Sequence, residues 1–100
     1  MQIKNILVVC IGNICRSPMA KYWIELQHPT LKVDSAGLSA MVGHPADDKA
    51  ITCMDTVGID IREHHAKQIT ADLIKQSDLI LVMSINQQKH IEQKWPFAKG

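Results

Sequence analysis

The sequence predicts an α/β fold, an open parallel sheet with helices on both of its faces. Short apolar runs typical of buried parallel strands are the first observation behind this prediction. The second is that segments with apolar residues at helical spacing alternate with these runs along the chain. Strands that alternate with helices imply a parallel sheet joined by right-handed crossovers. We expect a single domain over residues 1–100, with an adequate core and no internal repeat or linker.

Capping and breaking residues place the ends of the expected elements. Asp47 suits the first turn of a helix, where negative charge complements the helix dipole, and Gly58 is a natural stop. Thr70 can cap a brief helix, and Ser84 with Gln87 forms a capping box. The expected elements are strands over 3–9, 31–35 and 79–83, and helices over 18–28, 46–57, 70–76 and 84–95.

A tight loop is expected directly after the first strand. Cys10 ends the apolar run, and Gly12 and Asn13, which both accept positive φ at low cost, let the chain curl. Ser17 is a good N-cap residue and Pro18 suits the first helical position, so a helix is expected to begin there. The segment therefore predicts a strand, a tight loop and a helix N-terminus in succession.

This arrangement makes an anion-binding site at the carboxyl end of a parallel strand, where open α/β sheets place their ligands. The backbone N–H groups of a curled loop point inward as a nest, and the helix start adds positive potential. Arg16 adds a planar fork that matches two phosphate oxygens. The same field favours the thiolate of Cys10, a nucleophile for displacement at phosphorus. A buried strand cysteine followed by a surface arginine is the alternative.

Four stretches of the sequence are together similar to one known family. They are VCIGNICRSP over 9–18, VDSAG over 33–37, HHAKQI over 64–69 and DLILVM over 78–83. They resemble the low-molecular-weight protein-tyrosine phosphatases, the first stretch resembling the phosphate loop. Residues 35–38 with Gly43 look closest to the bacterial branch that dephosphorylates tyrosine autokinases of capsule and exopolysaccharide export. The resemblance implies a phosphate-binding loop after the first strand, no cofactor, and hydrolysis of phosphotyrosine through a phosphocysteine.

Roles in the expected chemistry follow from the residue types. Cys10 is expected to attack phosphorus in line, while Arg16 and the loop amides hold the equatorial oxygens and stabilise the transition-state charge. Two roles are open to Ser17, a donor to the Cys10 sulfur as it departs in the second step and a plain helix cap. The phosphate-binding residues are expected to be Ile11, Gly12, Asn13, Ile14, Cys15 and Arg16.

The resemblance also implies supporting and redox roles. It links Asn13, which is expected to hold the loop in shape, to Ser35 and His64; an exposed loop histidine is the alternative for His64. It further implies a reversible disulfide between Cys10 and Cys15 that protects the nucleophile from over-oxidation. A small buried residue is the alternative for Cys15.

The substrate side of the site is expected after the second strand. Leu38, Met41 and His44 are expected to form one wall of a cleft, because the family's specificity loop lies there; an ordinary solvated loop is the alternative. The resemblance implies a phosphotyrosine protein as partner, with a bacterial tyrosine autokinase as the candidate. Inorganic phosphate is the expected product or inhibitor.

Composition excludes several classes of partner and site. The formal charge of +1 gives no reason to expect nucleic acid or an acidic membrane as a partner. The longest apolar run, 6–11, is far short of a membrane span of roughly 20 residues. Three cysteines, an odd number, suit a reducing compartment and predict a cytoplasmic protein, with Cys53 in the core. No metal site is expected, because no Cys-x2-Cys or His-x3-His pair occurs and the adjacent His64 and His65 would point apart.

One family feature has no counterpart in the sequence. The family's general acid is the aspartate of an Asp-Pro pair after the third strand, and the 100 residues hold no Asp-Pro dipeptide. Because general acid–base help is worth about 10²–10⁴-fold, we expect this chain to form phosphocysteine but to turn over slowly. We expect a C-terminally incomplete domain that lacks the family's last strand and helix. Its uncovered third strand predicts dimerisation at the sheet edge.

Two other functions stay open at this point. A non-catalytic phosphate or phosphotyrosine binder is consistent with the missing acid, and an arsenate reductase would use the same scaffold. Arsenate reduction needs a relay of further cysteines, for which Cys53 alone on the second helix is a poor candidate. A phosphatase is therefore the function that the sequence favours.

Overall fold

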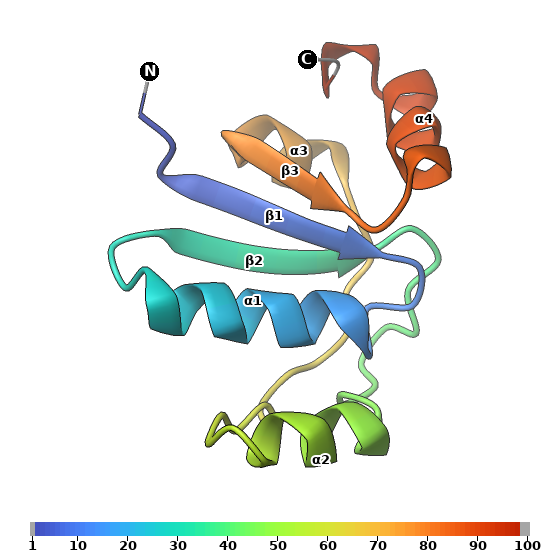
Figure 1. The fold of residues 1–100 in the computed structure, drawn as a ribbon. Helices are drawn as coiled ribbons and strands as arrows, with labels where there is room; N and C mark the ends of the chain where they lie inside the picture. The colour runs from blue at the N-terminus through green and yellow to red at the C-terminus, as the bar shows by residue number, and fades with distance from the viewer. Residues whose placement is uncertain (1, 99–100) are drawn as a thin grey trace.

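Three parallel strands form the sheet, and the strand that leads to the loop is central (Figure 1). The computed structural model describes residues 2–98. Its strands are β1 (Asn5–Cys10), β2 (Lys32–Gly37) and β3 (Leu79–Val82), in the order β2-β1-β3 with both pairings parallel. The predicted open parallel sheet is confirmed, and each strand boundary lies within two residues of its predicted position.

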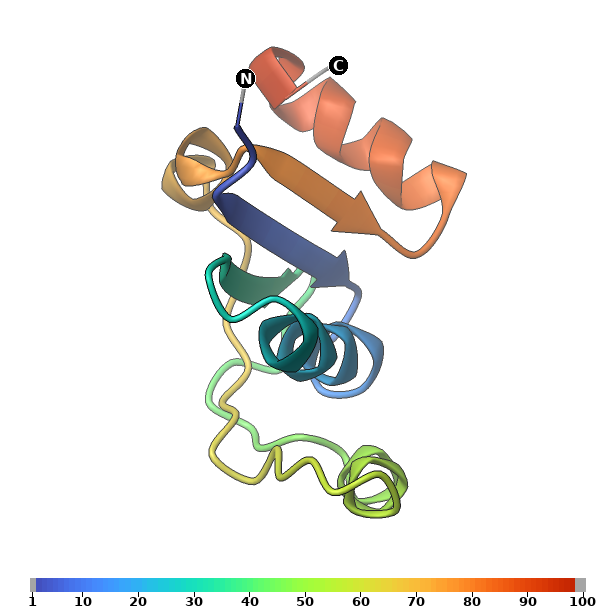
Figure 2. The ribbon, with the colours of Figure 1, turned by 60° about the vertical axis from the view of Figure 1, so that its left-hand side comes forward.

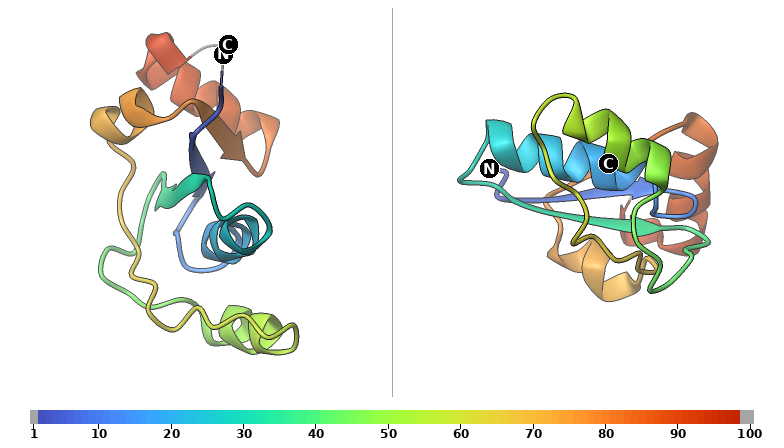
Figure 3. Two further views of the ribbon diagram at one scale, coloured as in Figure 1. Left: turned by 90° about the vertical axis from the view of Figure 1, so that its left-hand side faces the viewer. Right: turned by 90° about the horizontal axis from the view of Figure 1, so that it is seen from below.

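Helices cover both faces of the sheet, as the sequence predicts (Figures 1 and 2). α1 (Arg16–Gln27) covers one face, while α3 (Ala71–Gln76) and α4 (Ile85–Lys94) lie on the other. α2 (Asp48–Asp55) packs on α1, and Figure 3 shows it as the layer farthest from the sheet. A 3-10 turn, η1 (Pro96–Ala98), follows α4. Within residues 2–98, no helix combines the length and the apolar character that a membrane crossing requires.

The side chains of β1 alternate between two cores, because successive strand residues point to opposite faces of a sheet. Val8 packs in one core with Ile24 of α1. Leu7 packs in the other with Ile74 of α3 and Ile91 of α4. Burial on both faces fixes the path of β1, and it therefore fixes where the loop after the strand begins.

Helix α1 begins at Arg16, two residues before the predicted start at Pro18. Cys15 occupies the N-cap position and makes no side-chain cap bond. The interpretation of Ser17 as the helix cap is therefore wrong. Its hydroxyl is buried inside the site, where it meets other partners.

The caps of the two later helices are as predicted. The hydroxyl of Thr70 accepts the N–H of Leu73 at the start of α3, and the hydroxyl of Ser84 accepts the N–H of Gln87 at the start of α4. The return bond differs from a regular capping box, because Gln87 Oε1 accepts the N–H of Met83 rather than that of the cap residue. Both helix starts are therefore set by local sequence.

The expected core position of Cys53 is wrong. Helix α2 turns Ala50 and Met54 toward the core, and Cys53, which precedes Met54, is exposed. The helix is shorter than predicted at both ends, and its N-cap is Asp47, whose carboxylate accepts the N–H of Lys49. Its apolar stripe is therefore too narrow to include the cysteine.

Candidate active site

The loop over residues 11–15 lies at the edge where β1 and β2 both end (Figure 1). The strand register pairs Cys10 with Gly37, the last residues of the two strands. The two backbones approach closely here, since a Cβ on Gly37 would lie 2.5 Å from the carbonyl oxygen of Ile11. The chain that leaves β2 therefore runs directly along the loop that leaves β1.

Every backbone carbonyl from residue 10 to residue 14 accepts a hydrogen bond from outside the loop. Two segments supply the donors, one at residues 38–47 and one that contains His64. In order, the donors are the N–H groups of Leu38, Ser39 and Met41, Nε2 of His64 and the N–H of Asp47, at 2.9, 2.9, 3.0, 2.6 and 2.7 Å. The loop is thus held from outside at each peptide.

These outward bonds fix the direction of the loop N–H groups. The C=O and N–H of a planar trans peptide point in opposite directions, and no cis peptide occurs among residues 2–98. The N–H groups of residues 11–15 therefore point away from the surrounding segments, and none of them has an acceptor within the described chain. Successive N–H groups of this kind form an anion-binding nest beside the start of α1.

Asn13 supports the loop through both its backbone and its side chain. Its φ of 58° is the positive value that the sequence predicts, whereas Gly12 does not take a positive φ. Its Nδ2 donates to the hydroxyls of Ser17 at 2.8 Å and Ser35 at 3.0 Å, and its Oδ1 accepts the N–H of Lys67 at 2.8 Å. The buried amide thus joins the loop to α1, β2 and the 64–69 segment.

Cys10 and Ser17 lie in contact at the base of the loop. The sulfur and the hydroxyl oxygen are 2.8 Å apart, and both side chains are buried. The Asn13 amide can only donate to Ser17 Oγ, so the Ser17 hydrogen is free to donate to the sulfur. This geometry suits a donor that stabilises a thiolate.

His64 is buried beneath the loop, so the alternative of an exposed loop histidine is wrong. Its Nε2 must carry a hydrogen, because its partner at 2.6 Å is the carbonyl oxygen of Asn13. Burial lowers the pKa of His64, an effect that the hydrogen bond to Asn13 opposes in part. The neutral ring, protonated at Nε2, is the form that the site favours.

Arg16 and Cys15 both lie at the loop exit with exposed side chains. Arg16 is the first residue of α1, and its guanidinium makes no hydrogen bond or ion pair with residues 2–98. Cys15 is exposed, which excludes the alternative of a small buried residue. Cys10 and Cys15 are both free thiols in this structure. Within the described residues, no three His, Cys, Asp or Glu side chains group to hold a metal ion.

The expected substrate wall is a hydrogen-bonded segment rather than a loose loop. Leu38 and Met41 donate to the loop through their N–H groups, and the His44 carbonyl accepts the N–H of Ala66. Met41 is 45% exposed and Ile11, on the loop itself, is 53% exposed. Apolar side chains therefore rim the site on two sides.

Sequence reasoning missed two residues of the site. Lys67 binds the Asn13 amide through its backbone N–H, and Gln68 binds the backbone of residues 38–40 through its side chain. A backbone donor carries no residue-type signal. The Gln68 contacts join positions that are 28 and 30 residues apart, so local pattern could not reveal them.

Comparison with known proteins agrees with this geometry. The family model described as low molecular weight phosphotyrosine protein phosphatase matches residues 5–99. A low molecular weight protein-tyrosine-phosphatase, Ptp, of Acinetobacter johnsonii is 65% identical over 100 residues, which are 100% of this chain and 70% of that protein. The similar phosphatase Wzb of Escherichia coli is 48% identical over 90 residues, which are 90% of this chain and 59% of that protein.

Solved structures share the fold. The Erwinia amylovora tyrosine phosphatase AmsI has a TM-score of 0.92 at 43% identity, over 95% of this chain and 63% of that one. The YwlE arginine phosphatase of Geobacillus stearothermophilus has a TM-score of 0.90 at 34% identity, over 95% of this chain and 62% of that one. The chain thus spans between 59% and 70% of the length of these four relatives. The family model covers all but the first four residues and the last, and with this level of identity the chain belongs to the low-molecular-weight phosphotyrosine protein phosphatases.

Proposed function

We propose that this chain hydrolyses phosphotyrosine through a phosphocysteine on Cys10. The observation that carries the proposal is the set of N–H groups over residues 11–15, which have no acceptor among residues 2–98 and surround the exit of a strand that ends in a buried thiol. A nest beside a nucleophile suits displacement at a bound phosphate. The hydroxyl of Ser17, 2.8 Å from the sulfur, adds a donor for the thiolate.

The reaction has two displacements at phosphorus. In the first, the Cys10 thiolate forms an S–P bond while the P–O bond to the tyrosine ring breaks and its electron pair leaves on the phenolate oxygen. The loop N–H groups and Arg16, at the start of α1, hold the equatorial oxygens. In the second, water attacks phosphorus and the S–P bond breaks, with the departing thiolate stabilised by Ser17. The product, inorganic phosphate, competes for the same loop.

The rim of the site supports an aryl substrate. The exposed apolar side chains of Ile11 and Met41 can cover a flat ring whose phosphate lies in the loop. We propose a phosphotyrosine protein as the substrate. The similarity of residues 35–38 to the autokinase-directed branch of the family supports a bacterial tyrosine autokinase in that role. A cytoplasmic location, favoured by three free cysteines, is part of the same proposal.

We also propose that this chain turns over slowly, and the dependence of the rate on the leaving group tests this. The 100 residues hold no Asp-Pro pair, and Asp47 is engaged as the cap of α2. With no acid assigned, the rate of phosphocysteine formation should fall steeply as the pKa of the leaving phenol rises. Nitrophenyl phosphate should lose least, because its phenolate leaves without a proton. A flat dependence combined with rapid turnover would contradict slow turnover in this chain.

Intact-mass measurement after mixing with nitrophenyl phosphate separates this function from its alternatives. We expect a phosphorylated chain, and none in Cys10→Ser. Phosphate binding without a phosphorylated chain would indicate a non-catalytic binder, and arsenate-dependent loss of free thiols would indicate a reductase. Cys53, exposed on α2, gives the reductase little support. Faster release of phosphate from phosphoarginine than from phosphotyrosine would indicate that phosphoarginine, and not phosphotyrosine, is the substrate.

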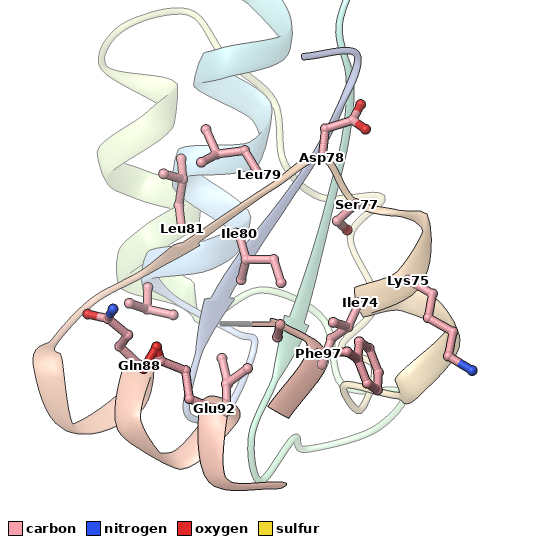
Figure 4. Close-up of a pocket in the computed structure, with 13 residues that line it drawn as sticks. Ile74, Lys75, Ser77, Asp78, Leu79, Ile80, Leu81, Gln88, Glu92 and Phe97 are labelled. Atoms are coloured by element: carbon pink, nitrogen blue, oxygen red, sulfur yellow. The ribbon is translucent and has the colours of Figure 1, made fainter. Parts of the chain in front are cut away.

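We propose in addition that two copies associate through the free edge of β3. Within residues 2–98 this strand pairs only with β1. A groove of about 720 Å³ runs beside it between α3 and α4 (Figure 4). Residues 79–81 of the strand are part of its lining, and the side chain of Ile80 packs on the core that α3 and α4 share. A two-fold axis would bring this edge against its own copy, which satisfies unpaired backbone groups on both.

Sedimentation equilibrium tests the dimer. Leu79→Lys places a charge on the edge at a side chain that is already 37% exposed, so it should shift the chain to monomer without unfolding it. Val57→Lys, at a side chain 64% exposed beyond α2, is the matched control and should leave the association unchanged. A native chain that stays monomeric at high concentration would exclude this assembly.

A further inference from the structure

The 38–44 segment is hydrogen-bonded along both of its sides. Its inner side binds the carbonyls of the phosphate loop, as described above. On its outer side lies the 66–69 segment. The backbone of the 66–69 segment binds Gly37, which precedes residue 38, and it also binds Gly43 and His44, the last two residues of the 38–44 segment. Between those two points no backbone hydrogen bond joins the segments among the described residues. The side chain of Gln68 occupies that gap.

Gln68 makes two hydrogen bonds across the gap. Its Nε2 donates to the carbonyl oxygen of Leu38 at 2.7 Å, and its Oε1 accepts the N–H of Ala40 at 2.8 Å. A carbonyl and an N–H from residues two apart are the pair that one residue of a neighbouring parallel strand would bind. A carboxamide carries the same acceptor and donor. Gln68 therefore replaces one residue of a strand.

One peptide group transmits this contact to the phosphate loop. The C=O of Leu38 and the N–H of Ser39 belong to the same plane and point in opposite directions. Gln68 binds the carbonyl end, and the carbonyl oxygen of Ile11 accepts the N–H end at 2.9 Å. Fixing this plane fixes the Ile11 carbonyl, and the same rule then aims the Gly12 N–H into the nest. Polarisation from both ends strengthens each bond.

We propose that Gln68 is a positioning residue for the phosphate loop, acting through the 38–44 segment. Its effect on catalysis rests on the proposed function, whereas its effect on the segment does not. Gln68 is itself exposed, so its removal opens no cavity in the core. The loss should therefore fall on phosphate affinity and turnover more than on the melting temperature.

Two substitutions test the proposal against a role in packing alone. Gln68→Ala removes both hydrogen bonds. Gln68→Glu keeps the shape and the acceptor for Ala40, but it has no donor for the Leu38 carbonyl and places a negative oxygen against it. Gln93→Ala and Gln93→Glu, at an exposed glutamine of α4, are the matched controls. Inorganic phosphate affinity, kcat and KM for nitrophenyl phosphate, melting temperature and amide exchange over residues 38–40 are measured for all four.

The two Gln68 variants should each weaken phosphate binding about 5- to 30-fold, raise KM and lower kcat. Gln68→Ala loses both hydrogen bonds, whereas Gln68→Glu loses one and sets a negative oxygen against the Leu38 carbonyl. Exchange of the Ser39 and Ala40 amides should speed up in Gln68→Ala, and the Gln93 variants should match the native chain. Native-like affinity in Gln68→Glu would indicate packing and overturn the proposal, as would unchanged amide exchange in Gln68→Ala. If the native chain neither binds phosphate nor reacts, the proposed function fails. The exchange measurement then still decides whether Gln68 holds the 38–44 segment in place.

Discussion

Backbone hydrogen bonding differs between two borders of this sheet, the carboxyl ends of its strands and the edge formed by β3. Beyond the carboxyl ends of β1 and β2, the loop carbonyls, the 38–44 segment and the 66–69 segment bind one another in successive layers. At the far side of the sheet, β3 has four residues and one partner strand among the described residues, and its edge borders an open groove. Among the described residues, the loop backbone is held by more neighbours than the β3 edge.

The reason lies in the nest itself. N–H groups turned inward for an anion give up protein acceptors, so no helix or strand ladder can hold that stretch of chain. Its carbonyls are the only backbone groups left through which the protein can fix the loop. Outside donors must therefore bind each of them, as they do over residues 10–14. Substitutions in and around the loop should therefore matter more than substitutions at exposed positions of α2 and α4 and in the turn after α2.

The largest expected effect is on the nucleophile. Cys10→Ser should lower hydrolysis of nitrophenyl phosphate by about 10³-fold or more, because a hydroxyl is a far weaker nucleophile than a thiolate. Binding of inorganic phosphate should survive, since the nest is made of backbone. Cys53→Ser, at an exposed thiol of α2, is the control and should leave both quantities unchanged. Comparable losses in the two variants would place the nucleophile elsewhere.

The next effect is on stability. Asn13→Ala removes three buried or partly buried hydrogen bonds and places a side chain at φ 58°, so it should lower the free energy of unfolding by about 3 kcal/mol. Asn13→Gly should recover about 1 kcal/mol of that loss, because glycine accepts the backbone angle. Asn86→Ala, at an exposed residue of α4, should change little. Urea unfolding measures all three, and equal losses for the alanine and glycine variants would show that the backbone angle contributes nothing.

Two glycines sharpen the comparison further. A Cβ on Gly37 would lie 2.5 Å from the Ile11 carbonyl oxygen and 3.0 Å from Ala40 Cβ, so Gly37→Ala should force the layers apart and destabilise by about 2 kcal/mol. Gly58, after α2, has φ 77° and open space around it, so Gly58→Ala should cost only about 1 kcal/mol, from its backbone angle. Phosphate affinity should fall in the first variant alone. A fall in phosphate affinity in both variants would mean that the close approach of the two backbones at Gly37 is not the cause of the effect.

Local sequence signals correctly predicted the features that depend on neighbouring residues in the chain. The hydroxyls of Thr70 and Ser84 cap the helices that they were expected to cap, and Asn13 has the positive φ expected from its residue type. The apolar runs fixed the strands within two residues, because burial on both faces leaves little freedom of register.

Local signals failed where a distant partner outweighs them. Ser17 is a good cap by type, but Asn13 and Cys10 engage its hydroxyl, and the helix starts earlier without a side-chain cap. Gly12 has the freedom to take positive φ and does not use it. Gln68 reads as an ordinary polar residue, and only the fold brings it to the 38–44 segment. Contacts of this separation have no periodicity to reveal them.

The smallest effect concerns the pH dependence of stability. Burial lowers the pKa of His64, so the unfolded chain binds a proton more readily than the folded one below the ordinary histidine value of about 6.5. The free energy of unfolding should therefore fall as pH drops through that window, and it should be level above it as far as His64 is concerned. His64→Gln keeps a donor for the Asn13 carbonyl and does not titrate, so this part of the slope should disappear.

The slope is measured by following the unfolding of the native chain and of His64→Gln from about pH 5 to pH 8. Equal slopes in the native chain and His64→Gln would mean that the buried ring is protonated in the folded state as readily as in the unfolded one. The Asn13 carbonyl would then be held by a cation, and the loop would gain a positive charge beneath it as the pH falls.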